Sequence, residues 1–388
     1  MNSQSLSPCY IVEETKLLDN LRLIEDISKR ADVEIILALK AFANWKLFPI
    51  INRYVRHTTA SSLYEARLSA DYFGGLTYSY SPAYETDTFN DLLACSEHVT
   101  FNSLSQYERF IPYVRAFNKS GQHHVSAGLR INPEYSEIET ELYNPCAPGS
   151  RFGVKCSSLE SGLPEDIEGL HFHCLCENDS SALEHVMTRV EERFGKFLDQ
   201  VKWLNMGGGH LVTRKGYDVE KLIGCINNIH QRHPGLKVIM EPGSAFLWQT
   251  GYLQSTVVDV VENDGISTAI LNVSFTCHMP DCLEMPYMPD VRGAEKLEIT
   301  PNEAAGLSGV YRLGGNSCLS GDYMGFWKFD KPLEVGDTVV FEDMIHYTTV
   351  KTNMFNGINH PSIALKHTDG SIEVLKRYSY EDYRDRMD

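Results

Sequence analysis

The first two-thirds of the chain alternates between short apolar runs and longer stretches in which apolar residues recur at helical spacing. The run Val33–Leu39 is compact and apolar, which is typical of a strand buried on both faces. Seven later runs predict further strands, at His57–Ala60, Thr77–Ser79, His98–Phe101, Val125–Ile131, Gly169–Cys174, Val201–Met206 and Lys237–Met240. Helices are expected between them at Leu63–Tyr72, Ser105–Phe117, Ser181–Gln200 and Val219–Arg232.

Alternation of strands and helices through eight strands predicts a (β/α)₈ TIM barrel, which we place over residues 14–247. Its first helix is indicated by apolar residues from Leu17 to Ile27 at helical spacing, with Thr15 as the expected N-cap. The long segment Asn132–Pro164 is rich in prolines, glycines and acidic residues and is expected to be a loop at the barrel mouth.

The pattern changes after Gly251, where short strands follow one another without a convincing long helix. They are predicted at Tyr252–Glu262, Ile266–Ser274, Val310–Leu313, Thr338–Glu342, Ile345–Val350, Ser362–Leu365 and Ser371–Lys376. Residues 248–388 therefore predict a C-terminal all-β domain of the sandwich or barrel-like kind. The extended segment at residues 8–13 is expected to add an N-terminal strand to it.

The composition of the chain disfavours some classes of binding partner. The formal net charge of −17 disfavours nucleic acid and is compatible with a cationic substrate. No apolar run is long enough for a bilayer and no secretory pattern opens the chain, so a cytoplasmic protein with ten reduced cysteines is expected. Alternation along a strand would put His171 and His173 on one face and Cys174 and Cys176 on the other, so no metal site is expected.

Four chemically useful features fall at the predicted carboxyl ends of barrel strands, where such barrels place their active sites. Lys40 follows the first strand, His173 ends the sixth, Gly207-Gly208-Gly209 follows the seventh and Glu241 follows the eighth. Each alone has an ordinary explanation as a solvated charge, a core residue or a tight turn. Together they meet the needs of pyridoxal 5′-phosphate, which requires a lysine, a ring-stacking surface, a phosphate loop and a carboxylate for the ring nitrogen.

These residues carry a resemblance to a known family. The run Leu37–Ala41, with His173, the three glycines and Glu241-Pro242-Gly243, resembles the alanine-racemase-like (fold type III) decarboxylases, which include the ornithine, arginine and diaminopimelate enzymes. The segment Gly315–Asp322 is similar to the cysteine-containing loop of that family. Tyr347 and Phe355-Asn356-Gly357 are similar to its last characteristic segment.

Within the family, His278–Tyr287 resembles the branch that decarboxylates carboxynorspermidine and carboxyspermidine. Leu319 supports this assignment, because the diamine and diaminopimelate enzymes carry an acidic residue there. The resemblance implies a role in polyamine biosynthesis, with norspermidine or spermidine as the product.

The resemblance also implies a role for each matched barrel residue. Lys40 would hold the cofactor through an imine, His173 would stack on its ring, and Glu241 would pair with the ring nitrogen. Gly208 and Gly209 would bind its phosphate through main-chain N–H groups. Two positions depart from the family: Ser244 replaces a phosphate-binding arginine, and Cys176 replaces a serine near the phosphate.

The C-terminal domain would supply the remaining groups. The Tyr347 hydroxyl would help to hold the phosphate, and Cys318 would deliver a proton to Cα after carbon dioxide leaves. Asp322, Glu284 and His278 would face the substrate and its cationic tail. Because sites in this family form at a homodimer interface, Cys318 and Asp322 are expected to serve the other subunit.

Three alternatives stay open at this point. One is a diaminopimelate, ornithine or arginine decarboxylase of the same fold. Another is a non-catalytic pyridoxal-phosphate-binding regulatory protein, against which the β-domain and Cys318 argue. The last is a sugar-phosphate enzyme on the same barrel, which would not need Lys40 at the rim.

Overall fold

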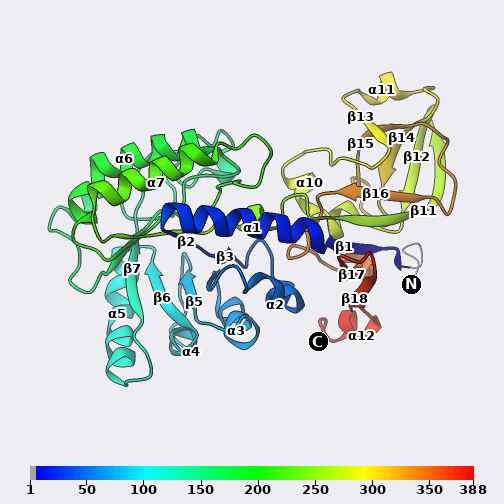
Figure 1. Ribbon diagram of the computed structural model, residues 1–388. Coiled ribbons are helices and arrows are strands. Elements are labelled where there is room, and N and C mark those ends of the chain that lie inside the picture. Colours follow the sequence, from blue (N-terminus) through cyan, green and yellow to red (C-terminus); the bar gives the residue numbers. More distant parts are fainter. Residues whose placement is uncertain (1–5) are drawn as a thin grey trace. The chain divides into compact units, whose positions relative to one another are not determined.

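The computed structural model describes residues 6–388, and the chain divides into two compact units (Figure 1). The barrel unit is Asn20–Phe246. The β-unit combines Leu247–Asp388 with the described residues up to Asp19. Helix α1 (Glu14–Ala31) begins in the β-unit and ends in the barrel unit.

The barrel unit contains one parallel sheet in the order β2-β10-β9-β8-β7-β6-β5-β4-β3. Its strands are β2 (Val33–Ile35), β3 (Leu37–Ala38), β4 (Thr58–Ala60), β5 (Thr77–Tyr80), β6 (Ser96–Phe101), β7 (Ser126–Arg130), β8 (Gly169–His171), β9 (Trp203–Asn205) and β10 (Lys237–Met240). β2 and β3 are two halves of one run, separated at Ile36. Because β2 pairs with β10 and β3 pairs with β4, this run closes the sheet. The predicted eight-stranded barrel is confirmed.

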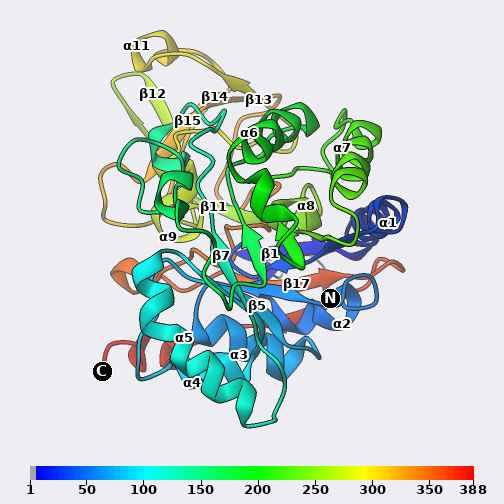
Figure 2. The same cartoon turned by 90° about the vertical axis from the view of Figure 1, so that its left-hand side faces the viewer.

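Helices surround this barrel, with α3, α4 and α5 on the side opposite α6 and α7 in two views (Figures 1 and 2). They are α2 (Phe48–Ile51), α3 (Leu63–Tyr72), α4 (Phe89–Ala94), α5 (Leu104–Lys119), α6 (Ser180–Leu198), α7 (Val219–Arg232) and α8 (Gly243–Leu247). Ser62, Ser103 and Asp218 each accept a hydrogen bond from an N–H three residues later, which satisfies a free donor of the first turn.

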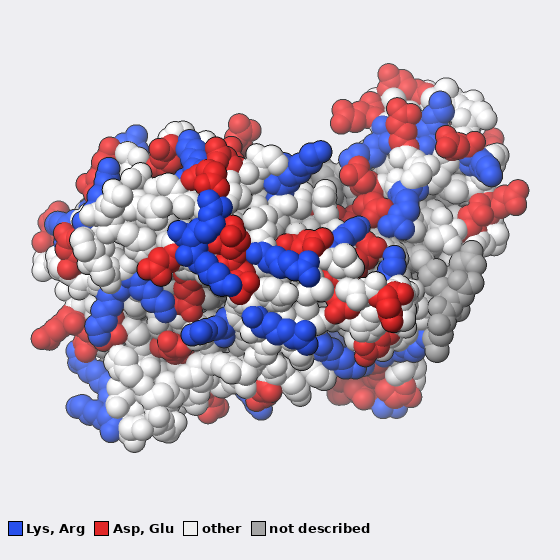
Figure 3. Space-filling model, in the orientation of Figure 1, with Lys and Arg blue, Asp and Glu red and all other residues white. Residues whose placement is uncertain are grey.

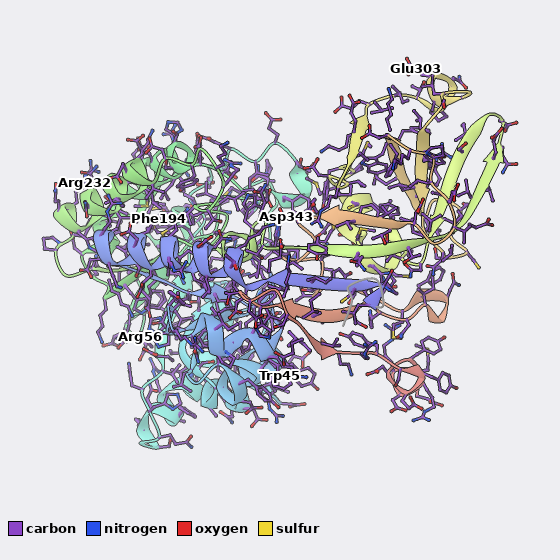
Figure 4. The ribbon with its side chains drawn as sticks, turned by 45° about the vertical axis from the view of Figure 1, so that its right-hand side comes forward. Trp45, Arg56, Phe194, Arg232, Glu303 and Asp343 are labelled. Atoms are coloured by element: carbon purple, nitrogen blue, oxygen red, sulfur yellow. The ribbon has the colours of Figure 1, made fainter. Side chains whose placement is uncertain are left out.

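Two helices show how burial follows the apolar pattern. Figure 4 labels Phe194 on α6 and Arg232 at the end of α7. Phe194 is fully buried, whereas Arg232 has an exposed side chain.

The N-cap predicted at Thr15 is wrong, because α1 begins at Glu14, directly after β1 (Cys9–Glu13), and Thr15 lies within its first turn.

The barrel interior is shaped around a tryptophan. A Cβ atom placed on Gly128 or Gly169 would lie 2.2 or 1.9 Å from ring atoms of Trp203, so β7 and β8 need glycine where this ring packs. The indole N–H donates to the Ser126 hydroxyl at 2.9 Å, which satisfies its one buried donor.

The β-unit contains a sheet in the order β13-β15-β14-β12-β11-β1-β17-β18, with β16 also paired to β11. Its strands are β1, β11 (Gly251–Asn263), β12 (Ile266–Leu271), β13 (Ala294–Leu297), β14 (Val310–Gly314), β15 (Tyr323–Phe329), β16 (Thr338–Glu342), β17 (Ser362–Lys366) and β18 (Ile372–Lys376). Its short helices are α9 (Phe275–His278), α10 (Pro280–Glu284), α11 (Pro301–Ala304) and α12 (Tyr380–Arg384). Figure 4 labels Glu303 on α11 and Asp343 just after β16. β1 runs antiparallel to β11 and parallel to β17.

The strand predicted at Ile345–Val350 is wrong, because this segment is a series of turns. The Thr349 hydroxyl donates to the Ile345 carbonyl at 2.9 Å, and Tyr347 has a left-handed φ of 55°. Local side-chain hydrogen bonds of this kind replace the pairing that a strand would need. The sequence pattern also missed β13 and β15.

Lys and Arg are interspersed with Asp and Glu over the side seen in Figure 3. Over residues 6–388, we find no helix with the length and apolar character needed to cross a membrane.

A cluster of charged groups lies toward the amino-terminal ends of the barrel strands. His57 Nδ1 lies 2.5 Å from Glu34 Oε1 and His57 Nε2 lies 3.1 Å from Glu97 Oε2, while Lys237 Nζ lies 2.6 Å from Glu34 Oε2. Burial disfavours the charged forms of His57 and Glu34, but the ion pairs that these residues make have a larger effect on their pKa values. They raise the pKa of His57 to about 9 and lower the pKa of Glu34 to about 2.

This cluster predicts a pH-dependent stability. The raised pKa of His57 makes its contribution complete below pH ~6.5 and lost as pH rises through about 9. The lowered pKa of Glu34 makes its contribution complete above pH ~4.3 and lost as pH falls through about 2. We expect His57→Gln to lower the free energy of unfolding by roughly 1–2 kcal/mol at pH 6 and by much less at pH 10. Urea denaturation at the two pH values measures this, and equal losses would contradict it.

Candidate active site

The parallel register brings the four predicted features to one rim of the barrel. His171 pairs with Asn205 across β8 and β9, and Asn205 pairs with Ile239 across β9 and β10. The residues that follow these strands, His173, the three glycines and Glu241, therefore leave the sheet at the same level. Lys40 leaves it at the closing run β2/β3.

Glu241 is a buried carboxylate with a fixed position. It is 8% exposed, and its Oε1 accepts a hydrogen bond of 2.7 Å from the Asn205 side-chain amide. Burial raises the pKa of Glu241, while the bond from Asn205 and the charge of Lys40 act in the other direction. His171 Nε2 lies 3.8 Å from the other carboxylate oxygen.

Lys40 has an environment that lowers the pKa of its amine. Its side chain is reached by solvent at the barrel mouth but is surrounded by protein groups. This burial lowers its pKa, and the charge of Arg130 lowers it further. The negative charge of Glu241 raises it and thereby limits the total decrease.

His173 is held in one orientation by the glycine loop. Its Nδ1 accepts a hydrogen bond of 2.7 Å from the Gly208 N–H. Burial lowers the pKa of His173, with the charges of Lys40 and Arg130 acting in the same direction. The imidazole is therefore neutral and oriented, with its proton on Nε2.

The three glycines are required by close backbone approach. A Cβ on Gly207 would lie 2.4 Å from the Phe172 carbonyl oxygen, one on Gly208 2.5 Å from that of Glu241, and one on Gly209 2.0 Å from that of Leu175. Gly207 and Gly209 also have left-handed φ values of 69° and 86°. The Gly207 N–H donates to Asn205 Oδ1 at 2.9 Å, so two of the three amides have protein partners.

Arg130 at the end of β7 is a site residue that the sequence reasoning missed. It is 4% exposed, its guanidinium lies over the rings of Tyr80 and Phe152 at 4.7 and 4.5 Å, and it donates to the His173 carbonyl at 3.2 Å. Asn205 was also missed. The rule that selected Lys40, a polar residue at the end of a buried strand, would have found both.

Cys176 and Ser244, the two departures from the family pattern, differ in their surroundings. Cys176 is exposed, and its N–H donates to Asn178 Oδ1 at 2.8 Å. Partial desolvation by the surrounding protein, followed by the charge of Glu177, raises the pKa of Cys176. Ser244 is half-buried in α8, the short helix that follows Glu241 and Pro242.

The remaining predicted residues belong to the β-unit. Cys318 is exposed on the loop between β14 and β15, and its N–H donates to Asn356 Oδ1 at 2.8 Å. Asp322 is only 4% exposed; its Oδ1 accepts from the Thr276 N–H and its Oδ2 from the Ser317 N–H, each at 3.1 Å. Asp322 therefore connects the backbone of the cysteine loop to that of α9.

The other three β-unit predictions have different surroundings, and Glu284 is exposed. His278 is fully buried, its Nδ1 accepts from the Ser274 N–H at 3.1 Å, and burial lowers its pKa to about 3. Glu284 forms an ion pair with Lys351. Tyr347 is half-buried in the turn after β16.

Comparison with known proteins identifies the family. A family model described as "Pyridoxal-dependent decarboxylase, C-terminal sheet domain" matches residues 9–345. The chain belongs to the pyridoxal-dependent decarboxylases.

Curated relatives of this decarboxylase match it over nearly its whole length. It is 48% identical over 381 residues to the carboxyaminopropylagmatine decarboxylase of Synechocystis sp., covering 98% of this chain and 95% of that protein. It is 42% identical over 381 residues to the carboxynorspermidine/carboxyspermidine decarboxylase of Campylobacter jejuni, with 97% of each covered.

Solved structures agree with this placement. The carboxynorspermidine decarboxylase of Campylobacter jejuni, in complex with norspermidine, is 39% identical with a TM-score of 0.88, covering 98% of this chain and 99% of that one. The diaminopimelate decarboxylase of Helicobacter pylori, in complex with L-lysine, is 17% identical with a TM-score of 0.81 over 98% and 97%, and shares the fold.

The charges around Lys40 predict a measurable reactivity. In the cofactor-free decarboxylase we expect the pH midpoint for acylation of Lys40 to lie below that of an ordinary lysine, because burial disfavours the cation. Glu241→Gln should lower the midpoint further, since it removes the charge that raises the pKa. Competitive labelling followed by peptide mass analysis measures it.

Glu65→Gln is the matched control. Glu65 also raises the pKa of Lys40, but it ranks below Glu241 among the contributing charges. Its removal should produce the smaller downward shift. An unchanged or raised midpoint in Glu241→Gln would refute this account of the site.

Proposed function

We propose that this chain is a pyridoxal 5′-phosphate-dependent decarboxylase of carboxynorspermidine and carboxyspermidine, with norspermidine and spermidine as products. The observation that carries the proposal is a lysine and a buried, hydrogen-bonded carboxylate on the same rim of the barrel, in a family of pyridoxal-dependent decarboxylases. The relatives named above indicate the substrate class.

The rim residues fit this cofactor. Lys40 offers the amine that would hold it, Glu241 offers a carboxylate for its ring nitrogen, and His173 offers a neutral, oriented ring. When bound, the cofactor supplies an acceptor for the electron pair that remains on Cα when carbon dioxide leaves. Asn205 keeps the carboxylate of Glu241 in place, and Thr59 also bonds to it.

The glycine loop would bind phosphate mainly through Gly209. The Gly208 N–H already donates to His173, and the Gly207 N–H donates to Asn205. Gly208 would therefore contribute only by sharing its donor with the imidazole. In the β-unit, the hydroxyl of Tyr347 would provide the second phosphate contact.

Cys318 would carry out the protonation step that follows loss of carbon dioxide. Loss of carbon dioxide leaves Cα one proton short, and the thiol of Cys318 would deliver that proton and regain one from solvent. We propose that the chain works as a homodimer in which this loop serves the other subunit's site. Asp322 and Asn356 would hold the loop's backbone, so Asp322 acts by position rather than by binding the cationic tail.

Two candidate substrate types differ in the chemistry of the substrate's tail. Leu319 is 45% exposed on the cysteine loop and provides no charge for a short diamine, which favours a longer polyamine. Carboxyaminopropylagmatine is the second candidate, because the relative that acts on it is 48% identical. The two substrate types differ in ending in an amine or a guanidinium group.

A product assay tests the proposal. The purified protein, supplied with pyridoxal phosphate, is given carboxynorspermidine, carboxyspermidine and carboxyaminopropylagmatine, and in parallel diaminopimelate, ornithine and arginine. Carbon dioxide and the product amine are measured for each. We expect the highest kcat/KM on the two carboxylated triamines. The Lys40→Ala variant should turn over none of the substrates. Preference for the guanidino substrate would establish the second candidate. Preference for diaminopimelate, ornithine or arginine, or no turnover of any of them, would refute both.

Cys318→Ala should lower kcat by about 10²-fold or more while cofactor absorbance is retained, because the proton donor is lost and the barrel rim is untouched. Cys225→Ala is the control, since Cys225 is another free thiol but lies on α7 of the barrel unit. Equal effects of the two substitutions would contradict a proton-donating role for Cys318.

Asp322→Ala and Asp322→Asn separate positioning from tail binding. The alanine removes both acceptors of the Thr276 and Ser317 amides, whereas asparagine keeps one oxygen. For a positioning residue we expect kcat to fall in Asp322→Ala and to recover partly in Asp322→Asn, with KM little changed. A raised KM with normal kcat in both variants would instead show that Asp322 binds the tail.

A further inference from the structure

Two cysteines meet at the barrel mouth, and the proposed reaction uses neither. Cys146 lies in the long loop between β7 and β8, which also contains the short 3₁₀ helices Glu141–Tyr143 and Cys156–Leu159. Cys174 lies three residues beyond the end of β8. The Sγ atoms of Cys146 and Cys174 are 3.4 Å apart, and both are free thiols.

Hydrogen bonds anchor the backbone on both sides of this contact. The Cys146 N–H donates to Asn144 Oδ1 at 2.9 Å, which is a turn-forming bond. The Ser136 hydroxyl, from the same loop, donates to the Cys174 carbonyl at 2.8 Å. The two sulfur atoms are therefore held together by fixed segments that are 28 residues apart along the chain.

The two thiols differ in access and acidity. Cys146 is half-buried, whereas Cys174 is 2% exposed. The bond with Cys174 lowers the pKa of Cys146, with further help from the main chain at Tyr135 and the charge of Arg130. Burial raises the pKa of Cys174. Cys146 is thus the thiol that an oxidant in solution would reach first and in its more reactive form.

We propose that Cys146 and Cys174 form a peroxide-sensitive pair that closes to a reversible disulfide. The Cys146 thiolate attacks hydrogen peroxide, which gives a sulfenic acid and hydroxide. The Cys174 thiol then attacks the Cys146 sulfur, forms the S–S bond and releases water. In total the two thiols lose two hydrogen atoms, and one peroxide is reduced to two waters.

The disulfide would join the mouth loop to the segment that begins at His173. Cys174 directly follows His173, whose carbonyl accepts from Arg130 and whose ring is held by Gly208. Oxidation would therefore fix the loop next to the residues that hold this imidazole. The modification itself is a covalent change of the chain and does not depend on the proposed decarboxylation.

Peptide mapping of the full chain tests the pair. The protein is treated with one equivalent of hydrogen peroxide and digested without reductant. We expect the peptides of Cys146 and Cys174 to be recovered joined, about 2 Da lighter than their sum, and separated by dithiothreitol. A failure to cross-link, or Cys146 joined equally to other cysteines, would overturn the proposal.

Single substitutions give the controls. In Cys174→Ser the reaction should stop at the Cys146 sulfenic acid, which dimedone traps, and in Cys146→Ser no link to Cys174 should form. Cys156→Ser, in the same loop, should leave the cross-link unchanged, since the Cys156 sulfur contacts the Arg193 carbonyl instead. Loss of the link in Cys156→Ser, or a link to Cys174 in Cys146→Ser, would contradict the pairing.

Discussion

The geometry of the barrel rim depends on the side-chain amide of Asn205. Its Nδ2 donates to Glu241 and its Oδ1 accepts from Gly207, at 2.7 and 2.9 Å. One short side chain thus fixes both a buried carboxylate and the first turn of the glycine loop. Gly208 orients His173, and Glu241 limits the fall in the pKa of Lys40. A substitution of Asn205 would therefore change both the orientation of His173 and the pKa of Lys40.

The β-unit uses the same kind of support for a loop rather than for a strand end. Asp322 is buried and accepts two main-chain N–H groups, and Asn356, at a left-handed φ of 58°, accepts the N–H of Cys318. A buried acid with satisfied oxygens costs less than a free one and defines a single loop conformation. The thiol of Cys318 is thereby exposed on a backbone that is held from two sides.

The sequence was most informative where burial makes apolar residues recur at the spacing of a strand or a helix. Apolar runs identified every barrel strand, and the rule that sites lie at strand ends selected Lys40, His173 and Glu241. It was least informative where a residue acts through its surroundings. Arg130 and Asn205 lie at strand ends where the same rule applies, but the sequence does not show which groups their side chains contact. Asp322 was interpreted as facing a cationic substrate, and in the structure it accepts hydrogen bonds from two main-chain amides. The β-branched residues at 345–350 predicted a strand, but threonine hydroxyls close local turns there.

The placement of β1 has a consequence for synthesis on the ribosome. This strand contains Cys9–Glu13, yet both of its neighbours, β11 and β17, begin more than 200 residues later. The barrel segment Asn20–Phe246 can collapse as soon as it emerges, whereas the edges of β1 must wait until almost the entire chain has been translated. The first strand made is therefore among the last to find its partners, and its apolar residues need protection from wrong pairing during that interval.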